Sequence, residues 1–500
     1  MRRTLSAILA GALLLGSCSN PSSEQRVPFT RPDQRTTATT TSPTAGPSTS
    51  DPTTGATTTT STGGEVIDGA QGSAGLGDPY FPELGNSGYD VTHYAIDLFV
   101  EPELNIIDGA VAIDAVATTD LASFNLDFIE QLPIESVLVD GQAAAHRLDG
   151  EELVITPATA LEAGEEFVVQ VEYSGTPPER FLANESLQMG WQQTAEGTFV
   201  VAEPDSAHTW FPSNDHPADK ATFTFRIQVP EPFTAVANGV LIGSAPSLGE
   251  TTTFVWEMRQ PMATYLATVV VAELVRIDRG TVDGVILRDY LPPTSSDPPP
   301  FQKTAEVLEY LISIFGPYPF EAYGQVMVPD WPAALETQTI SVFGTPAISE
   351  SIVVHEAAHQ WFGDSVSPAT WQDVWLNEGF ATYAEWLWFE HTGGHIDDVA
   401  ENTRRFLGSA DHRPIGDPGV DELFGGAVYQ RGALTLHALR REVGDEVFFE
   451  ILRTWASRFE GQSVSTADFI ALAEELSGKD LSTLFEGWLF RSDLPDIPPG

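Results

Sequence analysis

The stretch Ser351–Gly363, SIVVHEAAHQWFG, carries two histidines that are four residues apart and flank a glutamate. Ser349 or Ser351 can cap a helix here, and Gly363 can end it. In a helix, His355 and His359 project from one face one turn apart, so both imidazoles can reach a single metal ion. Glu356 then lies beside the ion rather than on it. The chain has only 10 histidines in 500 residues, which makes a chance match rare, and the stretch predicts a metal-binding helix.

A third ligand is expected in WLNEGFATYAEW, where Glu378 follows His359 by nineteen positions. Two imidazoles and one carboxylate leave a coordination position open for water, as in catalytic zinc sites, whereas structural zinc sites are usually rich in cysteine. Glu385 lies on the same helical stripe as Glu378, either orienting a ligand or facing solvent. We therefore expect one zinc ion per chain, with Glu356 as the general base.

A second pair of histidines, His391 and His395 in EHTGGH, repeats the four-residue spacing. Gly393 and Gly394 lie between them and should end the helix there. The spacing therefore does not place both rings on one helical face, and a second metal site is not favoured.

The charge of the chain is strongly negative, with 71 Asp and Glu against 24 Lys and Arg and a formal charge of −47. Such a surface repels phosphate backbones, so nucleic-acid binding is not expected. It attracts cations and basic peptides, or serves only to keep the protein soluble.

The N-terminus predicts export and a lipid anchor. Arg2 and Arg3 precede an apolar run that is too short to span a bilayer, and the following Leu-Gly-Ser-Cys resembles a bacterial lipoprotein box. Cys18, the only cysteine, would be lipidated, and the protein would be anchored to the outer face of a bacterial cell membrane. Residues 1–18 are thus expected to be a signal peptide, and the Thr-, Ser- and Pro-rich residues 19–77 a disordered linker.

Two folded domains are expected after the linker. Residues 78–275 contain β-branched segments such as EFVVQVEYSG, ATFTFRIQVP and ATYLATVVVAEL, separated by turn residues, which predict an antiparallel all-β sandwich or saddle. Residues 276–500 change to helical periodicity, as in FQKTAEVLEYLISIFG, VYQRGALTLHALRREVGD and TADFIALAEELSG, each ended by a glycine. This second part is expected to be a mostly helical α+β domain with a short sheet at its start.

VVHEAAHQWFGD and WLNEGFATY resemble the gluzincin aminopeptidases, the family of alanyl aminopeptidases and leukotriene hydrolase. YDVTHYAIDL and EPDSAHTWFPSNDHPADKATF are similar to the saddle-shaped N-terminal domain of that family. The resemblance implies that residues 276–500 form a thermolysin-like catalytic domain, and that the C-terminal helical domain of the family is absent, leaving a more open cleft.

Further site residues follow from this resemblance alone. The Gly-x-Met-Glu-Asn strand of the family is matched by Ala333-Ala-Leu-Glu336-Thr337, so Glu336 is expected to grip the substrate ammonium. A second glutamate for this purpose falls on Glu203, although Val201 replaces the usual glutamine. The Tyr-Glu-Lys-Gly motif is matched by Tyr429-Gln-Arg-Gly432, which implies that Tyr429 stabilises the oxyanion.

Together, the residues and the resemblance predict a zinc aminopeptidase that acts on peptides with a free N-terminus. One alternative is a zinc endopeptidase, or another metallohydrolase such as an epoxide hydrolase, on the same scaffold. An alternative of another class is a surface lipoprotein that holds zinc without catalysis, although such a protein would need neither Glu356 nor Tyr429.

Overall fold

The computed structural model describes residues 70–499 except 185 and 411–412. Cys18, the predicted signal peptide and residues 19–69 of the predicted linker lie outside the described residues. Residues 70–77 do not fit the predicted linker, because β1 (Ala70–Gln71) pairs with β4 (Leu121–Asp127) and Ala74 bridges Asn86. The predicted boundary at residue 78 is therefore too late. None of the helices in the described ranges is both long enough and apolar enough to cross a bilayer.

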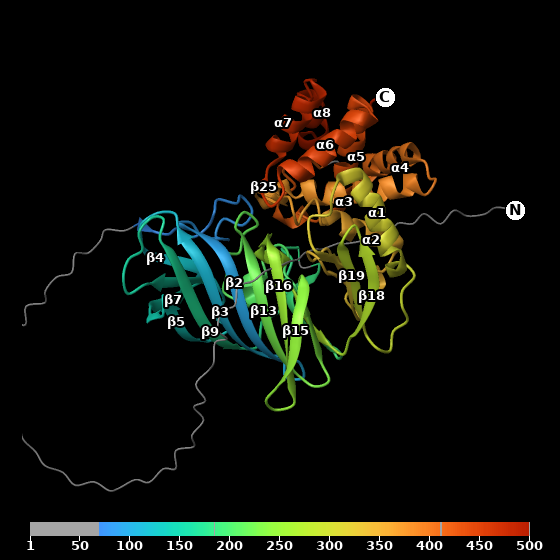
Figure 1. Cartoon of the computed structure of the whole chain (residues 1–500). Coiled ribbons are helices and arrows are strands. Elements are labelled where there is room, and N and C mark those ends of the chain that lie inside the picture. Colours follow the sequence, from blue (N-terminus) through green and yellow to red (C-terminus); the bar gives the residue numbers. More distant parts are fainter. Residues whose placement is uncertain (1–69, 185, 411–412, 500) are drawn as a thin grey trace, which may run out of the picture.

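The N-terminal domain is built on an eight-stranded sheet in the order β15-β16-β13-β2-β3-β9-β5-β6. Along β13, buried and half-buried residues alternate, as the period of two of a strand requires. Figure 1 shows how strongly this sheet curves. Its strands are β2 (Tyr89–Glu101), β3 (Ile106–Ala117), β5 (Ile134–Val139), β6 (Gln142–Ala143), β9 (Glu166–Gly175), β13 (Lys220–Pro230), β15 (Val240–Ser247) and β16 (Thr251–Ala263).

The predicted all-β N-terminal domain is confirmed, but its sheets are not wholly antiparallel. Strand β13 pairs with β2 in parallel, with Phe225 opposite Ile96. The two strands are separated by more than a hundred residues of sequence, so no hairpin constrains their direction. Strand alternation fixes which face is buried but not which distant strand becomes the neighbour.

Two smaller sheets complete this domain, one of five strands in the order β10-β11-β12-β17-β14 and one of four in the order β1-β4-β8-β7. The segment ATYLATVVVAEL, predicted as one strand, is a 3-10 turn at Thr264–Leu266 followed by a short strand. The remaining strands are β7 (Ala145–Asp149), β8 (Glu152–Thr156), β10 (Arg180–Phe181), β11 (Gln188–Gln193), β12 (Gly197–Val201), β14 (Thr234–Ala237) and β17 (Val269–Ala272).

The C-terminal half begins with a six-stranded mixed sheet in the order β18-β19-β21-β23-β22, with β20 paired to β19. Strand β22 lies at one edge and runs antiparallel to β23. This arrangement confirms the expected short sheet at the start of an α+β domain. The strands are β18 (Val275–Val282), β19 (Val285–Leu291), β20 (Ala322–Tyr323), β21 (Gln325–Val328), β22 (Ala334–Leu335) and β23 (Ser341–Gly344).

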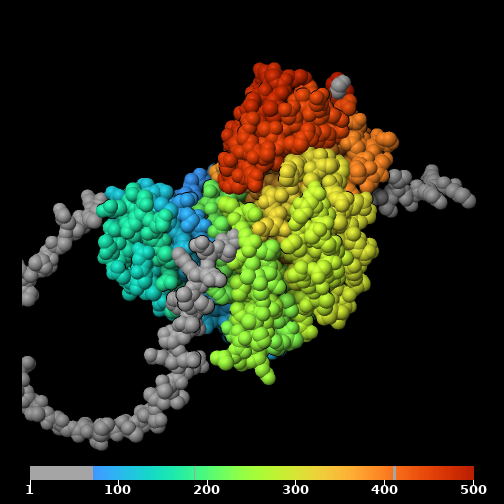
Figure 2. All heavy atoms as spheres, viewed as in Figure 1, coloured from blue at the N-terminus to red at the C-terminus, as the bar shows by residue number. Residues whose placement is uncertain are grey.

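Helices make up most of the rest, and the predicted glycine stops are confirmed at Gly316, Gly444 and Gly478. Buried apolar side chains of the two domains form one continuous cluster, and in Figure 2 the C-terminal helices (red) rest against the sheet-bearing part below them. The helices are α1 (Thr304–Phe315), α2 (Glu350–His359), α3 (Trp375–His391), α4 (Ile396–Ala410), α5 (Gly426–Val443), α6 (Asp445–Arg458), α7 (Thr466–Ser477) and α8 (Ser482–Phe485).

Candidate metal centre and catalytic site

Helix α2 presents the two predicted histidine ligands. Ser349 caps the helix by accepting a hydrogen bond from the backbone N–H of Ile352 at 3.2 Å. Ala357 and Ala358 are fully buried on the packed side. Their small side chains let α2 lie close to its neighbours, while His355 and His359 lie one turn apart with ring centroids separated by 4.7 Å.

Helix α3 brings the third predicted ligand to these rings. An Oε2 atom of Glu378 lies 3.2 Å from Nε2 of His355 and 3.5 Å from Nε2 of His359. One ligand atom from each of the three buried residues lies within 4.8 Å of the others, the spacing of a shared cation. Two imidazole nitrogens and one carboxylate oxygen, all buried, form the donor set of a catalytic zinc site with a position left for water.

Both imidazole rings are oriented by hydrogen bonds at their Nδ1 atoms. Nδ1 of His355 lies 2.8 Å from Oε1 of Glu385, whose other oxygen accepts from the Ser351 hydroxyl. Nδ1 of His359 lies 3.1 Å from the carbonyl oxygen of Phe362. Donation from Nδ1 leaves the Nε2 lone pair of each ring free for a metal. The position of Glu385 therefore fits the orienting alternative.

Glu356 is buried beside this centre, and neither of its carboxylate oxygens is hydrogen-bonded to any residue of the described ranges. Burial raises the pKa of Glu356 well above its ordinary value; His355 opposes the shift, and the charges of Glu378 and Glu385 add to it. A carboxylate with free oxygens and a raised pKa has the properties of a general base.

Two more carboxylates, those of Glu336 and Glu203, are buried at the same centre. Glu336 follows the edge strand β22, and its Oε1 lies 3.3 Å from Nδ1 of His359. Glu203 follows β12 on the N-terminal domain. Burial raises the pKa of Glu336 well above its ordinary value, and the charges of Glu203, Glu356 and Glu378 raise it further. This crowding of negative charge favours binding of cations.

Tyr429, in the first turns of α5, lies over the ring of His355 with centroids 6.0 Å apart and planes 20° apart. Burial raises the pKa of its phenol well above the ordinary value, and the charges of Glu378, Glu203, Glu336 and Glu356 act in the same direction. The phenol therefore keeps its proton and can donate a hydrogen bond. The structure thus gathers the seven residues predicted for zinc binding, catalysis and amine binding, and places Glu385 behind them.

A contact between two glycines, which the sequence analysis did not single out, sets the spacing of Glu378 and Tyr429. A Cβ added to Gly379 would lie 2.8 Å from the Cα of Gly432, and one added to Gly432 would lie 2.6 Å from the Cα of Gly379. Helices α3 and α5 thus cross with their backbones in contact, which only glycine permits. Both glycines stand in the motifs already quoted, next to Glu378 and three residues after Tyr429.

The second histidine pair does not form a metal site in the structure. Helix α3 ends at His391, whose ring stacks on Tyr310 with centroids 4.2 Å apart. Among the residues that the structure describes, the only cluster with metal-ligand spacing is His355, His359 and Glu378.

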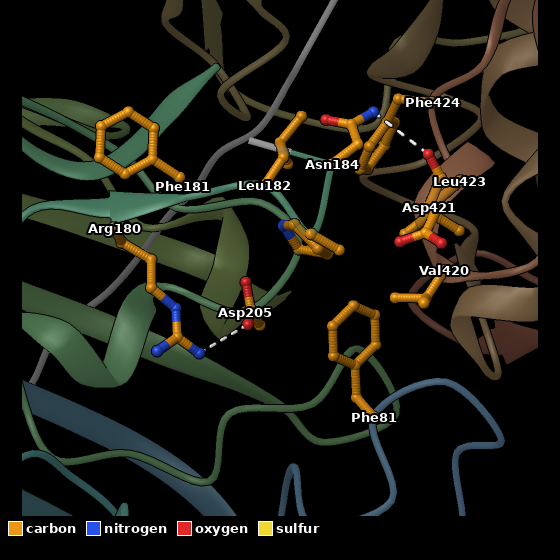
Figure 3. A pocket seen from close by; sticks show the side chains of 12 residues that line it. Phe81, Arg180, Phe181, Leu182, Asn184, Asp205, Val420, Asp421, Leu423 and Phe424 are labelled. Atoms are coloured by element: carbon orange, nitrogen blue, oxygen red, sulfur yellow. Dashed lines mark hydrogen bonds and ion pairs between the residues drawn. The ribbon is translucent and has the colours of Figure 1, made fainter. Parts of the chain in front are cut away.

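A cavity of about 320 Å³ lies between the two domains, and none of the seven site residues lines it. Figure 3 shows Asp205, Phe81 and Phe424 around it, with Asn184 donating from its side chain to the carbonyl of Asp421 at 3.1 Å across the domain interface. Pro204, which also lines the cavity, follows Glu203 in the chain, and Phe424 lies five residues before Tyr429. Both domains therefore contribute walls to this cavity.

Comparisons with known proteins agree with this geometry. Residues 90–266 match the Peptidase M1 N-terminal domain, and residues 300–488 match the Peptidase family M1 domain. Aminopeptidase M1 of Arabidopsis thaliana is 27% identical over 59% of this chain and 37% of its own length. Aminopeptidase N of Streptomyces lividans is 27% identical over 68% of this chain and 45% of its own length. The chain thus spans less than half the length of these two curated relatives.

Solved structures match over a larger share. The crystal structure of an M1 zinc metallopeptidase from Deinococcus radiodurans is 33% identical, with a TM-score of 0.80, and the match covers 85% of this chain and 98% of that one. A mutant of the same protein was solved with a Tyr-Ser-Ala substrate, with the same TM-score and 99% of its chain covered. Two matched domains, a zinc-type donor set and near-complete coverage of a solved M1 zinc metallopeptidase show that this chain belongs to peptidase family M1.

Proposed function

We propose that the protein is a zinc-dependent aminopeptidase that removes N-terminal residues from peptides. The observation that carries the proposal is a pair of buried carboxylates: Glu336, 3.3 Å from the metal ligand His359, and Glu203, whose charge acts on Glu336 and Tyr429. Neither carboxylate is needed to activate water or to stabilise the oxyanion, whereas two further buried carboxylates at the same centre can be compensated by a positive charge on the substrate. The ammonium of a free N-terminus supplies that charge.

The residues around the metal support water-mediated cleavage. Zinc bound here supplies Lewis acidity, which polarises the peptide carbonyl and lowers the pKa of water from about 15.7 towards roughly 7. Glu356 takes the proton of the attacking water and passes it to the leaving amine. The Tyr429 hydroxyl donates to the oxygen on which negative charge develops. Glu336 and Glu203 hold the ammonium and place the first peptide bond at the metal.

The printed names of relatives support the same activity. The proteins from Arabidopsis thaliana and Streptomyces lividans are named aminopeptidases, and the Deinococcus radiodurans mutant was crystallised with a tripeptide. The strand before Glu336 nevertheless reads Ala-Ala-Leu here, and Val201 stands two residues before Glu203. These side chains change the surroundings of the first peptide residue, so we propose the reaction class rather than a preferred residue.

Glu336→Ala is expected to lower the preference for free over acetylated N-termini by about 10–100-fold, because a charge-assisted hydrogen bond contributes about 1.5–3 kcal/mol. The measurement is kcat/KM for matched peptides with free and with acetylated N-termini. The exposed Glu306, replaced by alanine, is the matched control and should leave the ratio unchanged.

The same assay separates the competing functions. Equal cleavage of both peptides by the wild-type protein would identify an endopeptidase and overturn the proposal. Turnover of neither peptide, with zinc bound, would favour another hydrolase or a binding protein. Dialysis against a strong chelator should abolish turnover, and added zinc should restore it.

We further propose that the protein is exported and anchored by a lipid on Cys18 to the outer face of a bacterial membrane. The supporting observations are the basic residues, the short apolar run and the Leu-Gly-Ser-Cys sequence at the N-terminus. In a bacterial host, the wild-type chain should incorporate a fatty-acid label and sediment with membranes, whereas Cys18→Ser should do neither. Labelling of the Cys18→Ser chain would contradict the anchor.

A further inference from the structure

The two helices that supply the metal ligands are joined by residues 360–374, here called the connector. It begins where α2 ends at His359 and finishes where α3 begins, three residues before Glu378. Its first turn includes the Phe362 carbonyl that orients His359. The beginning of the connector therefore helps to orient the His359 ring, and its end leads into the helix that carries Glu378.

The N-terminal domain holds the beginning of the connector through Lys220, the first residue of β13. Its Nζ donates to the carbonyl oxygens of Asp364 and Ser365, each at 2.9 Å. The backbone N–H of Asp364 in turn donates to the carbonyl of His359 at 3.0 Å. Asp364 therefore takes part both in the contact with Lys220 and in a main-chain hydrogen bond to the last residue of α2.

The carboxylate of Asp364 faces the same lysine without a hydrogen bond of its own to any residue in the described part of the chain. Burial raises the pKa of Asp364 well above its ordinary value, while Lys220 opposes the shift. Loss of the lysine therefore removes the two hydrogen bonds that hold the main chain of the connector.

The N-terminal domain also holds the far end of the connector, through Asp78. One oxygen of this buried carboxylate accepts from the backbone N–H of Trp371 at 2.7 Å. The other accepts from the N–H groups of Tyr80 and Phe81 at 2.7 and 3.0 Å, which fixes the turn that carries it. Trp371 opens the 3-10 turn Trp371–Asp373, which leads directly into α3.

Tyr265 of the N-terminal domain contacts the connector at both of these ends. Its hydroxyl lies 3.4 Å from the carbonyl oxygen of Gly363, and its ring meets the Trp371 ring edge-on with centroids 4.9 Å apart. Three side chains of the N-terminal domain thus contact four residues of the connector, Gly363, Asp364, Ser365 and Trp371.

We propose that Lys220 and Asp78 are positioning residues for the metal: the β-sheet domain fixes both ends of the connector, so that His359 and Glu378 stay aimed at one point. The N-terminal domain would then help to retain the metal, in addition to supplying Glu203 for amine binding. The inference concerns zinc binding alone and does not depend on which peptide bond the enzyme cuts.

The test is the rate at which zinc passes from the full-length holoenzyme to a chromogenic chelator at 25 °C. Lys220→Met and Asp78→Ala are expected to release zinc about tenfold faster than wild type, the lower end of the effect of residues that support metal ligands. Lys220→Arg, which can still donate to the carbonyls, should recover most of the loss. With excess zinc, kcat of the variants should return to near the wild-type value.

The matched control is Lys303→Met. Lys303 also contacts α2, but at its N-terminal end, where it pairs with Glu350 at 2.8 Å. This variant should release zinc at the wild-type rate. Should Lys220→Met fold poorly, two other variants test the same idea. Lys220→Met/Asp364→Asn leaves no carboxyl group at position 364, and Tyr265→Phe removes only the hydroxyl near Gly363. Folded variants that release zinc no faster than Lys303→Met would overturn the proposal, whatever peptides the wild-type protein cleaves.

Discussion

Glu356→Gln is expected to lower kcat by about 10²–10⁴-fold, the usual contribution of a positioned general acid–base group. The amide has the size of the carboxylate but cannot take a proton from water. Both oxygens of Glu356 lack hydrogen-bond partners among the described residues, so the substitution breaks no contact that the structure shows. The loss should therefore fall on kcat, with KM within a few-fold of wild type because Glu336 and Glu203 remain.

Zinc content distinguishes loss of the base from loss of the metal. Glu356 is not one of the three ligand residues, so elemental analysis should find one zinc ion per chain in the variant. Glu350→Gln is the matched control on the same helix, since Glu350 lies in the first turn and pairs with Lys303. Near-normal turnover by Glu356→Gln would show that Glu356 is not the base. If the variant lacks zinc, the lower kcat reflects loss of the metal and does not support the assignment.

Periodicity within one helix made two of the three metal ligands predictable, and the motif that follows nineteen residues later supplied the third. A spacing of four residues fixes His355 and His359 on one face, and seven residues separate Glu378 from Glu385 along one stripe. These relations need no knowledge of the rest of the fold. The structure adds only the crossing of α2 and α3, which brings Glu378 within 3.2 Å of His355.

Contacts between distant segments were not predictable in the same way. Lys220 meets Asp364 across 144 residues of sequence, and Asp78 meets Trp371 across 293. A lysine and an aspartate are ordinary surface residues by composition, and nothing local marks their partners. The parallel pairing of β2 with β13 escaped prediction for the same reason, because alternation describes one strand at a time.

The segment containing Tyr265 shows how local propensity can mislead. Its β-branched residues predicted a strand through ATYLATVVVAEL, but Thr264–Leu266 forms a 3-10 turn. The Thr264 hydroxyl donates to the buried Asp215 at 2.7 Å, and Tyr265 reaches Gly363 in the other domain. Tertiary hydrogen bonds outweigh a propensity that amounts to less than about 1 kcal/mol per residue.

Tyr429→Phe is expected to lower kcat by about 10²–10³-fold, the usual cost of losing one donor to a developing oxyanion. Phenylalanine keeps the ring that lies over His355, so only the hydroxyl is removed. Because burial and four surrounding glutamates hold the pKa of the phenol well above its ordinary value, the wild-type residue enters the reaction as a proton donor. Zinc content and thermal stability should change little.

The alternative is that Tyr429 serves packing alone, and the control is chosen to separate the two roles. Tyr383 is also buried, on α3, with its hydroxyl 3.3 Å from Nδ1 of His437. If a buried hydroxyl matters only for the fold, Tyr383→Phe and Tyr429→Phe should have similar effects on stability and similar, small effects on kcat. If Tyr429 donates to the oxyanion, only its variant should lose turnover, and it should also bind a phosphonate transition-state analogue more weakly while binding the free amino-acid product as before.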